Sequence, residues 1–450
     1  MPKKSSRILH RQPNETLQVA AHGDGPYIIA EDGKRYIDAS GGAAVSCLGH
    51  SNAKVRQAIK DQVDKIAFAH TSFFTSQPAE ELADFLIEHA PEGLEYAYLV
   101  SGGSEAVESA LKLARQYFME RGEGSRKYFI ARRQSYHGNT LGALAVGGNM
   151  LRKQQFNPIL MDTEHLSPCY AYRDQKPDET EQEYGLRVAN ELEERIETLG
   201  AENVIAFVAE PVVGATSGAL TAVPGYFKRI REICDEHGIL LILDEVMCGM
   251  GRTGSLFACE QEGISPDILC IAKGLGAGYQ AIGAMLLSDK IYETITKGSG
   301  FFQHGHTYLA HPTACAAALA VQKEIQDNNL IDNVNLMGKK LESALLSRFV
   351  NYPNIGDIRG RGLFWGIELV ADRATKRPLD PALQIHSAIK KAAMAEGLIC
   401  YPAGGTIDGK LGNHVLLAPP FIINEDHIAE IVDKLGRAID LALVEKGIAV

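Results

Sequence analysis

The sequence predicts an α/β fold in which a parallel sheet forms the core of a large domain. Three unbroken apolar runs, residues 204–209, 239–243 and 268–272, have the composition of strands buried on both faces of a parallel sheet. Apolar residues recur at helical spacing over residues 107–118, which is typical of a helix with one buried face. Because 450 residues exceed the usual size of one domain, we expect a second, smaller domain.

The composition is that of an ordinary globular protein. Hydrophobic residues make up 45% and charged residues 22%, and the formal net charge of −11 argues against a nucleic acid or an anionic membrane as partner. No stretch has the roughly 18 apolar residues of a membrane span, and the basic N-terminus lacks the apolar segment of a signal peptide. The eight cysteines are scattered without a CxxC motif, so we expect reduced thiols in a cytoplasmic protein.

The N-terminal region is expected to form an arm, a hairpin and a helix. Residues 1–15 form the arm. Two β-type runs, residues 27–30 and 35–38, flank an Asp-Gly pair, which is typical of a hairpin turn. A helix is expected near residues 53–66. This piece is too small to bury a core by itself.

Similar patterns predict the elements of the remaining chain. Expected strands cover residues 96–100, 128–131, 364–370, 398–401 and 414–417. Expected helices cover residues 79–89, 180–198, 310–326, 331–350, 381–396 and 424–445. The charge-rich residues 173–200 are expected to be solvated. The pattern changes after residue 331, so we assign the C-terminal part to the smaller domain.

A glycine-rich turn between a strand and a helix is a candidate anion site. The strand of residues 96–100 is followed by Gly102, Gly103 and Ser104, and then by a helix that extends to about Phe118. The first backbone N–H groups of a helix are unpaired and its dipole favours negative charge, so a phosphate group fits there. The alternative is an ordinary turn in which Ser104 caps the helix.

Charged side chains follow each of the three buried runs. Glu210 follows the first run, Asp244 the second and Lys273 the third. Open α/β sheets place their chemistry at such strand ends. A lysine in a desolvated position loses its proton more easily and can act as an amine nucleophile. The alternative is that Asp244 caps the following loop while Lys273 extends to solvent.

A lysine and an acid at one sheet edge match the needs of pyridoxal 5′-phosphate (PLP). This cofactor requires a lysine amine for its aldehyde and an acid that keeps its pyridine nitrogen protonated, so that the ring accepts electrons. Tyr136, which follows the strand of residues 128–131, is an aromatic side chain that could stack on a planar ring. The alternative for Tyr136 is a place in the core.

Two other patterns suggest different ligands. Residues 249–254 match the GxGxxG pattern of dinucleotide sites, but they do not follow a strand directly and no long helix follows them. His304, His306 and His311 suggest a metal, but carboxylate or cysteine partners at ligand spacing are missing. We therefore expect neither a nicotinamide site nor a metal site.

The segments DEVMCGMGRTG, which contains Asp244, and IAKGLGAGYQAIGA, which contains Lys273, resemble the signature of the class III aminotransferases that act on ω-amino acids and ω-amines. The resemblance covers nearly the whole chain. It implies the PLP-dependent transferase fold type I, with a mostly parallel seven-stranded sheet in the large domain and a smaller α+β domain. Residues 67–330 would form the large PLP-binding domain. Residues 1–66 would join residues 331–450 in the small domain.

The resemblance also implies roles for individual residues. Lys273, Asp244 and Glu210 would be catalytic and would also contact the cofactor. The other cofactor-binding residues implied by the family are Gly103, Ser104, Tyr136, His137, Val246 and Thr307. Tyr136 would lie over the pyridine ring, with Val246 on its opposite face.

The implied activity is transfer of an amino group from an ω-amino acid or amine to a keto acid, with pyruvate as the expected acceptor, in a ping-pong cycle. In the family, the threonine matching Thr307 reaches the phosphate bound by the neighbouring subunit. This match implies a homodimer with shared active sites. A tetramer built from such dimers is the alternative.

The substrate site departs from the family pattern. Many family members carry an arginine that binds the substrate carboxylate, but the corresponding places here hold Leu416, in VLLAPPF, and Tyr401, in GLICYPAGG. The loop of residues 404–413 between them is longer than usual. Glu210 resembles the glutamate that pairs with such an arginine, and Lys410 or a residue of the partner chain could take the arginine's role. The alternatives are another PLP enzyme of the same fold (an aminomutase, epimerase, decarboxylating transaminase or phospholyase) and a PLP-binding protein without efficient chemistry.

Overall fold

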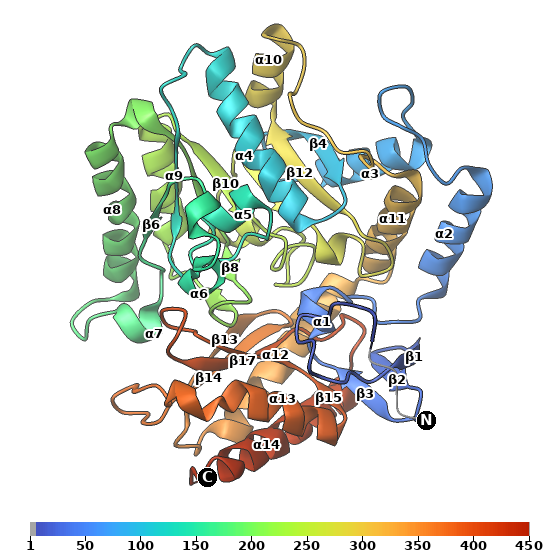
Figure 1. The fold of residues 1–450 in the computed structure, drawn as a ribbon, viewed down its shortest axis with the longest axis vertical. Helices are drawn as coiled ribbons and strands as arrows, with labels where there is room; N and C mark the ends of the chain where they lie inside the picture. The colour runs from blue at the N-terminus through green and yellow to red at the C-terminus, as the bar shows by residue number, and fades with distance from the viewer. Residues whose placement is uncertain (1–5, 450) are drawn as a thin grey trace.

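The computed structural model describes residues 6–449, and Figure 1 shows its two domains. The large domain, in the upper part of the view, surrounds a central sheet, and the smaller α+β domain lies below it. Segments from both ends of the sequence meet in the small domain. Within residues 6–449, no helix is both long and apolar enough to cross a membrane.

The central sheet has seven strands in the order β4-β12-β11-β10-β7-β5-β6. The strands are β4 (Leu94–Val100), β5 (Tyr128–Arg132), β6 (Thr163–Leu166), β7 (Val204–Ala209), β10 (Leu240–Asp244), β11 (Ile268–Ile271) and β12 (Gly283–Ser288). Strand β12 runs antiparallel to both of its neighbours, and the remaining pairs are parallel. The predicted mostly parallel seven-stranded sheet is confirmed.

Side chains of the central strands alternate between two hydrophobic cores. In β10, Leu241 and Leu243 pack into the core covered by α8 and α9, whereas Leu240 and Ile242 pack into the core covered by α4. This alternation explains why the run of residues 239–243 is apolar at every position. Full burial of each such side chain is worth about 1.5–3 kcal/mol.

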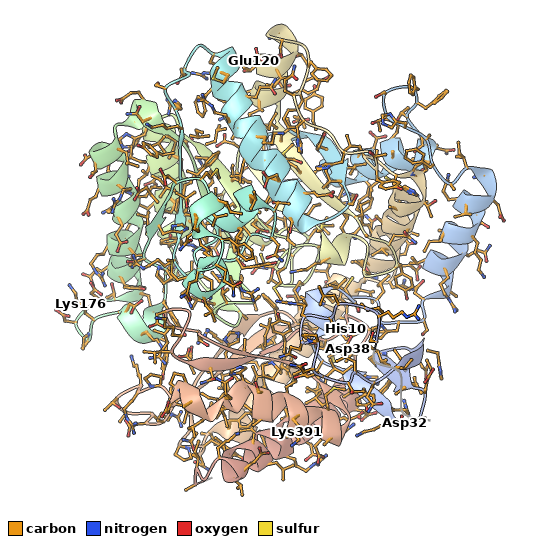
Figure 2. All side chains as sticks on the ribbon, in the orientation of Figure 1. His10, Asp32, Asp38, Glu120, Lys176 and Lys391 are labelled. Atoms are coloured by element: carbon orange, nitrogen blue, oxygen red, sulfur yellow. The ribbon has the colours of Figure 1, made fainter. Side chains whose placement is uncertain are left out.

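Helices cover both faces of this sheet. They are α3 (Gln77–Glu88), α4 (Gly103–Glu120), α5 (Leu141–Val146), α8 (Glu181–Leu199), α9 (Tyr226–Glu236), α10 (Asp289–Lys297) and α11 (Pro312–Asp327). Helix α2 (Ala53–Lys65) packs against α11, and α6 (Met150–Lys153) and α7 (Ala171–Asp174) are short helices between strands of the sheet in the sequence. The predicted helices of this region lie within two residues of the observed ones. The predicted solvated segment contains Lys176, which lies at the outer margin of the molecule (Figure 2) with its side chain 61% exposed.

The small domain contains two four-stranded sheets. One has the order β1-β2-β3-β15 and the other the order β13-β14-β17-β16. Their strands are β1 (Ala20–Asp24), β2 (Tyr27–Ala30), β3 (Arg35–Asp38), β13 (Ile355–Arg361), β14 (Phe364–Leu369), β15 (Leu398–Ile399), β16 (Tyr401–Gly404) and β17 (Asn413–Leu417). The helices are α12 (Leu330–Phe349), α13 (Ile385–Glu396) and α14 (Glu425–Glu445). Three short elements remain. Helix α1 (Gly41–Ala44) lies between β3 and α2 in the sequence, and β8 (Val212–Val213) and β9 (Leu220–Thr221) pair with each other between β7 and α9.

The single strand predicted for residues 398–401 is wrong. Leu398 pairs with Ile37 of β3 in one sheet, whereas Tyr401 pairs with Leu416 of β17 in the other. The chain therefore changes sheets at Cys400. A run of apolar residues does not show this change, because both short strands are apolar.

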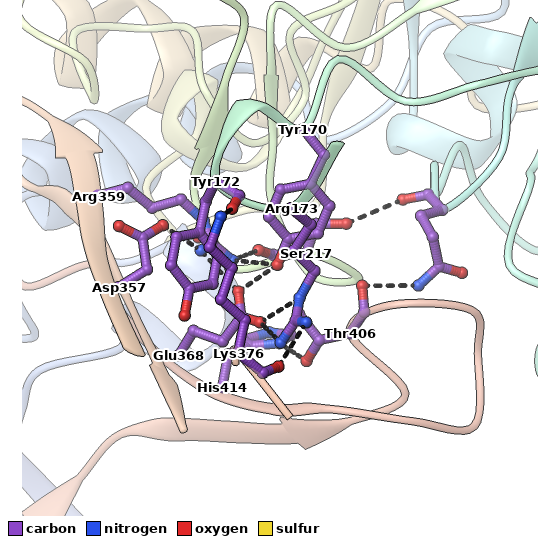
Figure 3. Close-up of polar contacts among 12 residues, drawn as sticks. Tyr170, Tyr172, Arg173, Ser217, Asp357, Arg359, Glu368, Lys376, Thr406 and His414 are labelled. Atoms are coloured by element: carbon purple, nitrogen blue, oxygen red, sulfur yellow. Dashed lines mark hydrogen bonds and ion pairs between the residues drawn. The ribbon is translucent and has the colours of Figure 1, made fainter. Parts of the chain in front are cut away.

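A buried ion-pair cluster joins the two domains (Figure 3). We call Tyr170, Arg173, Arg359 and Glu368 the Glu368 network. The Glu368 carboxylate accepts hydrogen bonds from Arg359 Nη1 at 2.8 Å, from Arg173 Nε at 2.7 Å and from the Tyr170 hydroxyl. Arg359 also donates to Asp357 and to the Gly218 carbonyl oxygen. Every polar group at the centre of this cluster has a partner.

Candidate active site

Three charged side chains meet at one edge of the central sheet. Glu210 follows β7, Asp244 ends β10 and Lys273 follows β11, and these strands are adjacent and parallel. All three side chains line one cavity of about 390 Å³. The predicted residues Gly103, Ser104, Tyr136, His137 and Val246 line the same cavity. The sheet thus brings together residues that are up to 170 positions apart in the sequence.

Asp244 is held by two hydrogen bonds. Its Oδ2 lies 2.8 Å from His137 Nδ1, and its Oδ1 accepts a hydrogen bond from the Val246 backbone N–H at 3.0 Å. Both Asp244 and His137 are buried. Asp244 therefore caps the following loop, as the alternative interpretation held, and it lines the cavity as well. Its carboxylate is fixed in orientation, as an acid must be to hold a ring nitrogen.

Lys273 lies inside the cavity and does not extend to bulk solvent. Its backbone has a positive φ of 45°, an unusual conformation that turns the chain directly after β11. Burial lowers the pKa of the Lys273 ammonium, and the nearby Asp244 and Glu210 carboxylates oppose this shift. The amine therefore loses its proton more readily than an ordinary lysine, which favours nucleophilic and general-base chemistry.

Glu210 is a buried carboxyl group whose partners are backbone amides. Its Oε1 accepts from the Tyr136 N–H at 3.0 Å and its Oε2 accepts from the Gly214 N–H at 3.1 Å. Burial raises the pKa of Glu210, the charge of His137 lowers it, and Asp244 raises it further. Among the described residues, Glu210 forms no ion pair with an arginine or lysine. The hydrogen-bond partners of Glu210, which the sequence left unidentified, are therefore backbone N–H groups.

The positions that correspond to the family's arginines are apolar or neutral. Leu416 is 1% exposed and belongs to a small core with Phe364 and Ala418. Tyr401 is its direct cross-strand neighbour and packs against the same core. Lys410 is exposed on the loop and does not line the cavity.

The N-terminus of α4 forms an open cradle at the other end of the cavity. Gly102 is the N-cap residue, and without a side chain it leaves the first N–H groups of the helix free. The predicted alternative, in which Ser104 caps the helix, is wrong, because Ser104 lies inside the helix and its Oγ accepts from the Asn139 N–H at 3.1 Å. A Cβ atom on Gly103 would lie 2.7 Å from Val246 Cγ1. Only glycine fits at this close approach, and the cradle suits a phosphate.

Several wall residues carried no signal in the sequence. Val45 reaches the cavity from the N-terminal region, and Gln280 and Ile282 reach it from the segment before β12. All three side chains are uncharged. Val45 stands in no motif, and Gln280 and Ile282 lie in the IAKGLGAGYQAIGA segment, in which only Lys273 was singled out. The sequence therefore located the charged groups of the cavity but not these uncharged wall residues.

Thr307 lies outside this cavity. Its side chain is exposed, close in sequence to the exposed Tyr308. A smaller cavity of about 270 Å³, lined by Tyr308 and His311, adjoins the main one through shared residues such as Ser101. The prediction that Thr307 serves a neighbouring subunit is therefore not tested by one chain.

The three histidines near this loop do not gather into a metal site. In the part of the chain that the structure describes, one group of potential ligand atoms is close enough for an ion, formed by Glu193, Glu236 and His237. The Arg229 guanidinium already pairs with Glu193 and lies 3.3 Å from Glu236. The positive charge of the Arg229 guanidinium thus already lies beside these two carboxylates.

These residues fit PLP in each of its parts. The cradle of α4 suits the phosphate, Asp244 suits the ring nitrogen, and the Lys273 amine suits the aldehyde. Tyr136 and Val246 line the space where the flat ring would lie. Fold and site together define a PLP-dependent enzyme of fold type I.

Comparisons with known proteins identify the family. The model of class III aminotransferases matches residues 8–439. An uncharacterized aminotransferase of Schizosaccharomyces pombe is 46% identical over 97% of this chain and 95% of its own, and the uncharacterized aminotransferase YodT of Bacillus subtilis is 38% identical over 99% of both. The crystal structure of the ω-transaminase from Pseudomonas jessenii in complex with PMP matches with a TM-score of 0.90 at 33% identity, covering 96% of this chain and 94% of that one.

The chain belongs to the class III aminotransferases. It is therefore a PLP-dependent aminotransferase, which takes an amine donor and a keto acid acceptor.

Proposed function

We propose that this enzyme moves an amino group from an ω-amino acid or an amine to a keto acid, with pyruvate as acceptor, in a ping-pong cycle. The observation that carries the proposal is the meeting of Lys273, Asp244 and Glu210 at three adjacent strand ends, opposite the open N-terminus of α4. Similarity to the ω-transaminase of P. jessenii supports the substrate class.

Each polar side chain of the cavity has its own role in the proposed reaction. PLP, when bound, supplies a protonated ring that stabilises negative charge on the substrate carbon. Lys273 Nζ takes the proton from the carbon that bears the amino group and later gives it up, and its lowered pKa suits both steps. Asp244, held by His137, keeps a proton on the ring nitrogen. Glu210 fixes the backbone that carries Tyr136.

The remaining residues bind and orient. Gly103 and Ser104 hold the phosphate through the start of α4, and Tyr136 and Val246 bound the two faces of the ring. The partner subunit's Thr307 completes the phosphate site in a homodimer. Exposed aromatic side chains support a partner at this surface: Phe73 is 79%, Phe301 62% and Tyr308 59% exposed.

We also propose the division into residues 67–330 as the large domain and residues 1–66 with 331–450 as the small domain. The pairing of β3 with β15 supports it, because it joins the two ends of the chain in one sheet. The cytoplasm is the proposed location, and it is supported by eight cysteines that are all free thiols.

A second candidate is a PLP enzyme of another reaction class, such as an aminomutase, epimerase, decarboxylating transaminase or phospholyase. The apolar neighbours Leu416 and Tyr401 favour it, because these positions offer no charge to an acceptor's carboxylate. Such an enzyme would turn over without an external keto acid.

The test is to add an amine without a carboxylate, such as 1-phenylethylamine, to the PLP-loaded enzyme and to follow the cofactor's visible absorbance. An ω-amine transaminase loses this band without a keto acid and regains it when pyruvate is added. If this amine leaves the band unchanged, a panel of ω-amino acids tests for a donor that requires a carboxylate. Turnover by donors that never bleach the band would favour the second candidate.

A further inference from the structure

The active-site cavity lacks a cation for the carboxylate of a substrate. Its charged side chains are Lys273, Asp244 and Glu210, and only the first is a cation. Lys273 would be engaged with the cofactor, and the start of α4 would hold its phosphate. The proposed keto acid nevertheless carries a carboxylate, and an unpaired carboxylate inside a cavity is costly. The compensating charge therefore comes from a side chain outside the residues of this chain that line the cavity.

Arg152, on helix α6, stacks on Tyr136 from outside the set of residues that line the cavity. Its guanidinium carbon lies 4.8 Å from the centroid of the Tyr136 ring, which lines the cavity. Burial raises the pKa of the Tyr136 hydroxyl, Arg152 lowers it, and Tyr401 raises it. Arg152 thus stands in the same neighbourhood as Tyr401, one of the two places where relatives of this chain carry an arginine.

The Arg152 guanidinium makes no hydrogen bond or ion pair with any residue between 6 and 449. Of the other arginines nearby, Arg132 donates to the Glu210 carbonyl oxygen and Arg133 donates to Ser167 Oγ at 2.7 Å, whereas Arg11 also lowers the pKa of the Tyr136 hydroxyl. A guanidinium over an aromatic ring keeps its in-plane N–H donors free. Arg152 is therefore positioned by Tyr136 while its donors are still available.

The long loop of the small domain supports the position of α6. Gly409 packs on this helix so closely that a Cβ atom there would lie 3.3 Å from the Leu151 backbone nitrogen. The Asn149 side chain caps the helix by accepting from the Arg152 N–H at 3.3 Å. The same loop accepts two hydrogen bonds, at 2.7 and 2.9 Å, from Gln134 Nε2, two residues before Tyr136. One loop thus contacts both the helix that carries Arg152 and the chain segment that carries Tyr136.

We propose that Arg152 binds the carboxylate of the keto acid acceptor, and of ω-amino acid donors, at the Tyr136 side of the cavity. Two parallel N–H donors of a guanidinium match the two oxygens of a carboxylate. Arg152 is thus a substrate-binding residue that supplies the charge missing at Leu416 and Tyr401. This inference rests on the proposed aminotransferase function.

The test compares Arg152→Gln with the wild type in each half-reaction of the PLP-loaded enzyme. The half-reaction with 1-phenylethylamine, which has no carboxylate, should keep its rate within about 2-fold, because Tyr136 and Lys273 are unchanged. The KM for pyruvate in the return half-reaction should rise about 10- to 100-fold. Propanal, an acceptor without a carboxylate, should react equally well with both enzymes.

A binding measurement removes the dependence on turnover. Calorimetric titration with propanoate, which carries the carboxylate but cannot react, should show a Kd raised by a similar factor in Arg152→Gln and partly restored in Arg152→Lys. Arg133→Gln is the matched control, because it removes an equal charge from the neighbouring surface. Equal effects in the control, an unchanged pyruvate KM, or an equal loss with propanal would each overturn the proposal. If no amine donor bleaches the cofactor band of the wild-type enzyme, the proposed aminotransferase function itself is refuted.

Discussion

The active-site cavity and the Glu368 network are both buried clusters of acids and bases, but their charges are treated in opposite ways. In the network, burial alone would raise the pKa of Glu368, but Arg359 and Arg173 outweigh it and hold this pKa below its usual range. In the cavity, burial prevails: it raises the pKa of Glu210 and lowers that of Lys273. Buried carboxylates are thus paired with arginines in one place, and in the other they are held by backbone amides and a histidine.

The difference separates a structural role from a chemical one. A fully paired cluster stabilises the folded state and has no free donor for a ligand. A cluster that contains a lysine with a lowered pKa keeps a reactive group at the expense of stability. Substitutions in the two regions should therefore affect different measurements.

The largest effect is expected from Lys273→Ala. Loss of the amine should lower turnover at least about 1,000-fold, because the variant lacks both the group that binds the cofactor covalently and the general base. The urea midpoint should stay the same or rise, because a poorly compensated buried amine is removed. Steady-state rates with PLP present and urea denaturation of the cofactor-free proteins measure the two effects, because the Lys273 amine is free only without the cofactor. Retained turnover in this variant would contradict the assignment of Lys273.

Glu368→Gln should show the reverse pattern. Removing one charge from a buried, fully paired cluster should lower the free energy of unfolding by about 3–5 kcal/mol, because two guanidinium groups lose their main partner. The chemical step should be unaffected at temperatures where the variant is folded. Glu425→Gln is the control, since it breaks the exposed pair with Lys340 and should change stability by less than about 0.5 kcal/mol. A loss of stability no larger than the control's would remove the contrast between the regions.

The pH dependence of stability should also differ in sign between Glu368 and Glu245, a buried glutamate that follows Asp244 but does not line the cavity. Burial raises the pKa of Glu245, the residue after Asp244, to about 7, although backbone hydrogen bonds from Ala258 and Cys259 lower this pKa. Its contribution to stability is thus complete below about pH 4.5 and is lost as the pH rises through 7, a change of about 3 kcal/mol relative to Glu245→Gln. The pKa of Glu368 is lowered, so its contribution is complete above about pH 4.5 and is lost as the pH falls.

Urea denaturation of the wild type and both glutamine variants between pH 4 and 8 measures the two slopes. Parallel slopes for Glu245→Gln and Glu368→Gln would contradict the opposite shifts. The wild type should be the reference in each buffer, because other groups titrate in the same range.

The smallest expected effect concerns two neighbouring tyrosines. The Tyr170 hydroxyl donates to Glu368 and accepts from Arg359 Nη2 at 3.1 Å, so Tyr170→Phe should cost about 1 kcal/mol. The buried Tyr172 hydroxyl has no hydrogen-bond partner within the described chain, so Tyr172→Phe should be neutral or slightly stabilising. Thermal or urea denaturation of the pair compares a satisfied hydroxyl with an unsatisfied one. A larger loss in Tyr172→Phe would reverse this assignment.

The sequence pointed to the reactive groups because each of them follows an apolar run. The runs before Glu210, Asp244 and Lys273 are long enough to identify as strands, and parallel strands end at one edge of a sheet. The patterns missed the seven-residue strand β13, which is part-buried at most positions, and other strands as well. Strand β12 was not expected, and residues 398–401 were assigned to one strand although they belong to two sheets.

Contacts between distant segments left no pattern to follow. Arg173 and Glu368 are 195 residues apart, and nothing in either local sequence pairs them. Helix α6 has four residues, too few to show a helical period, so Arg152 had no sequence signal near the cavity. The neutral side chains of Leu416 and Tyr401 were visible in the sequence, but the backbone partners of Glu210 were not.

The pairing of Ile37 with Leu398 has a consequence for how the cell makes this protein. A ribosome that adds about 5–20 residues per second releases Leu398 roughly 20 to 70 s after Ile37. During this time the whole central sheet can emerge and fold, while β3 waits with an open edge that could pair with other chains. The small domain forms last, and with it the wall that Val45 contributes to the cavity. The nascent enzyme thus completes its cofactor site only when its final strands have been synthesised.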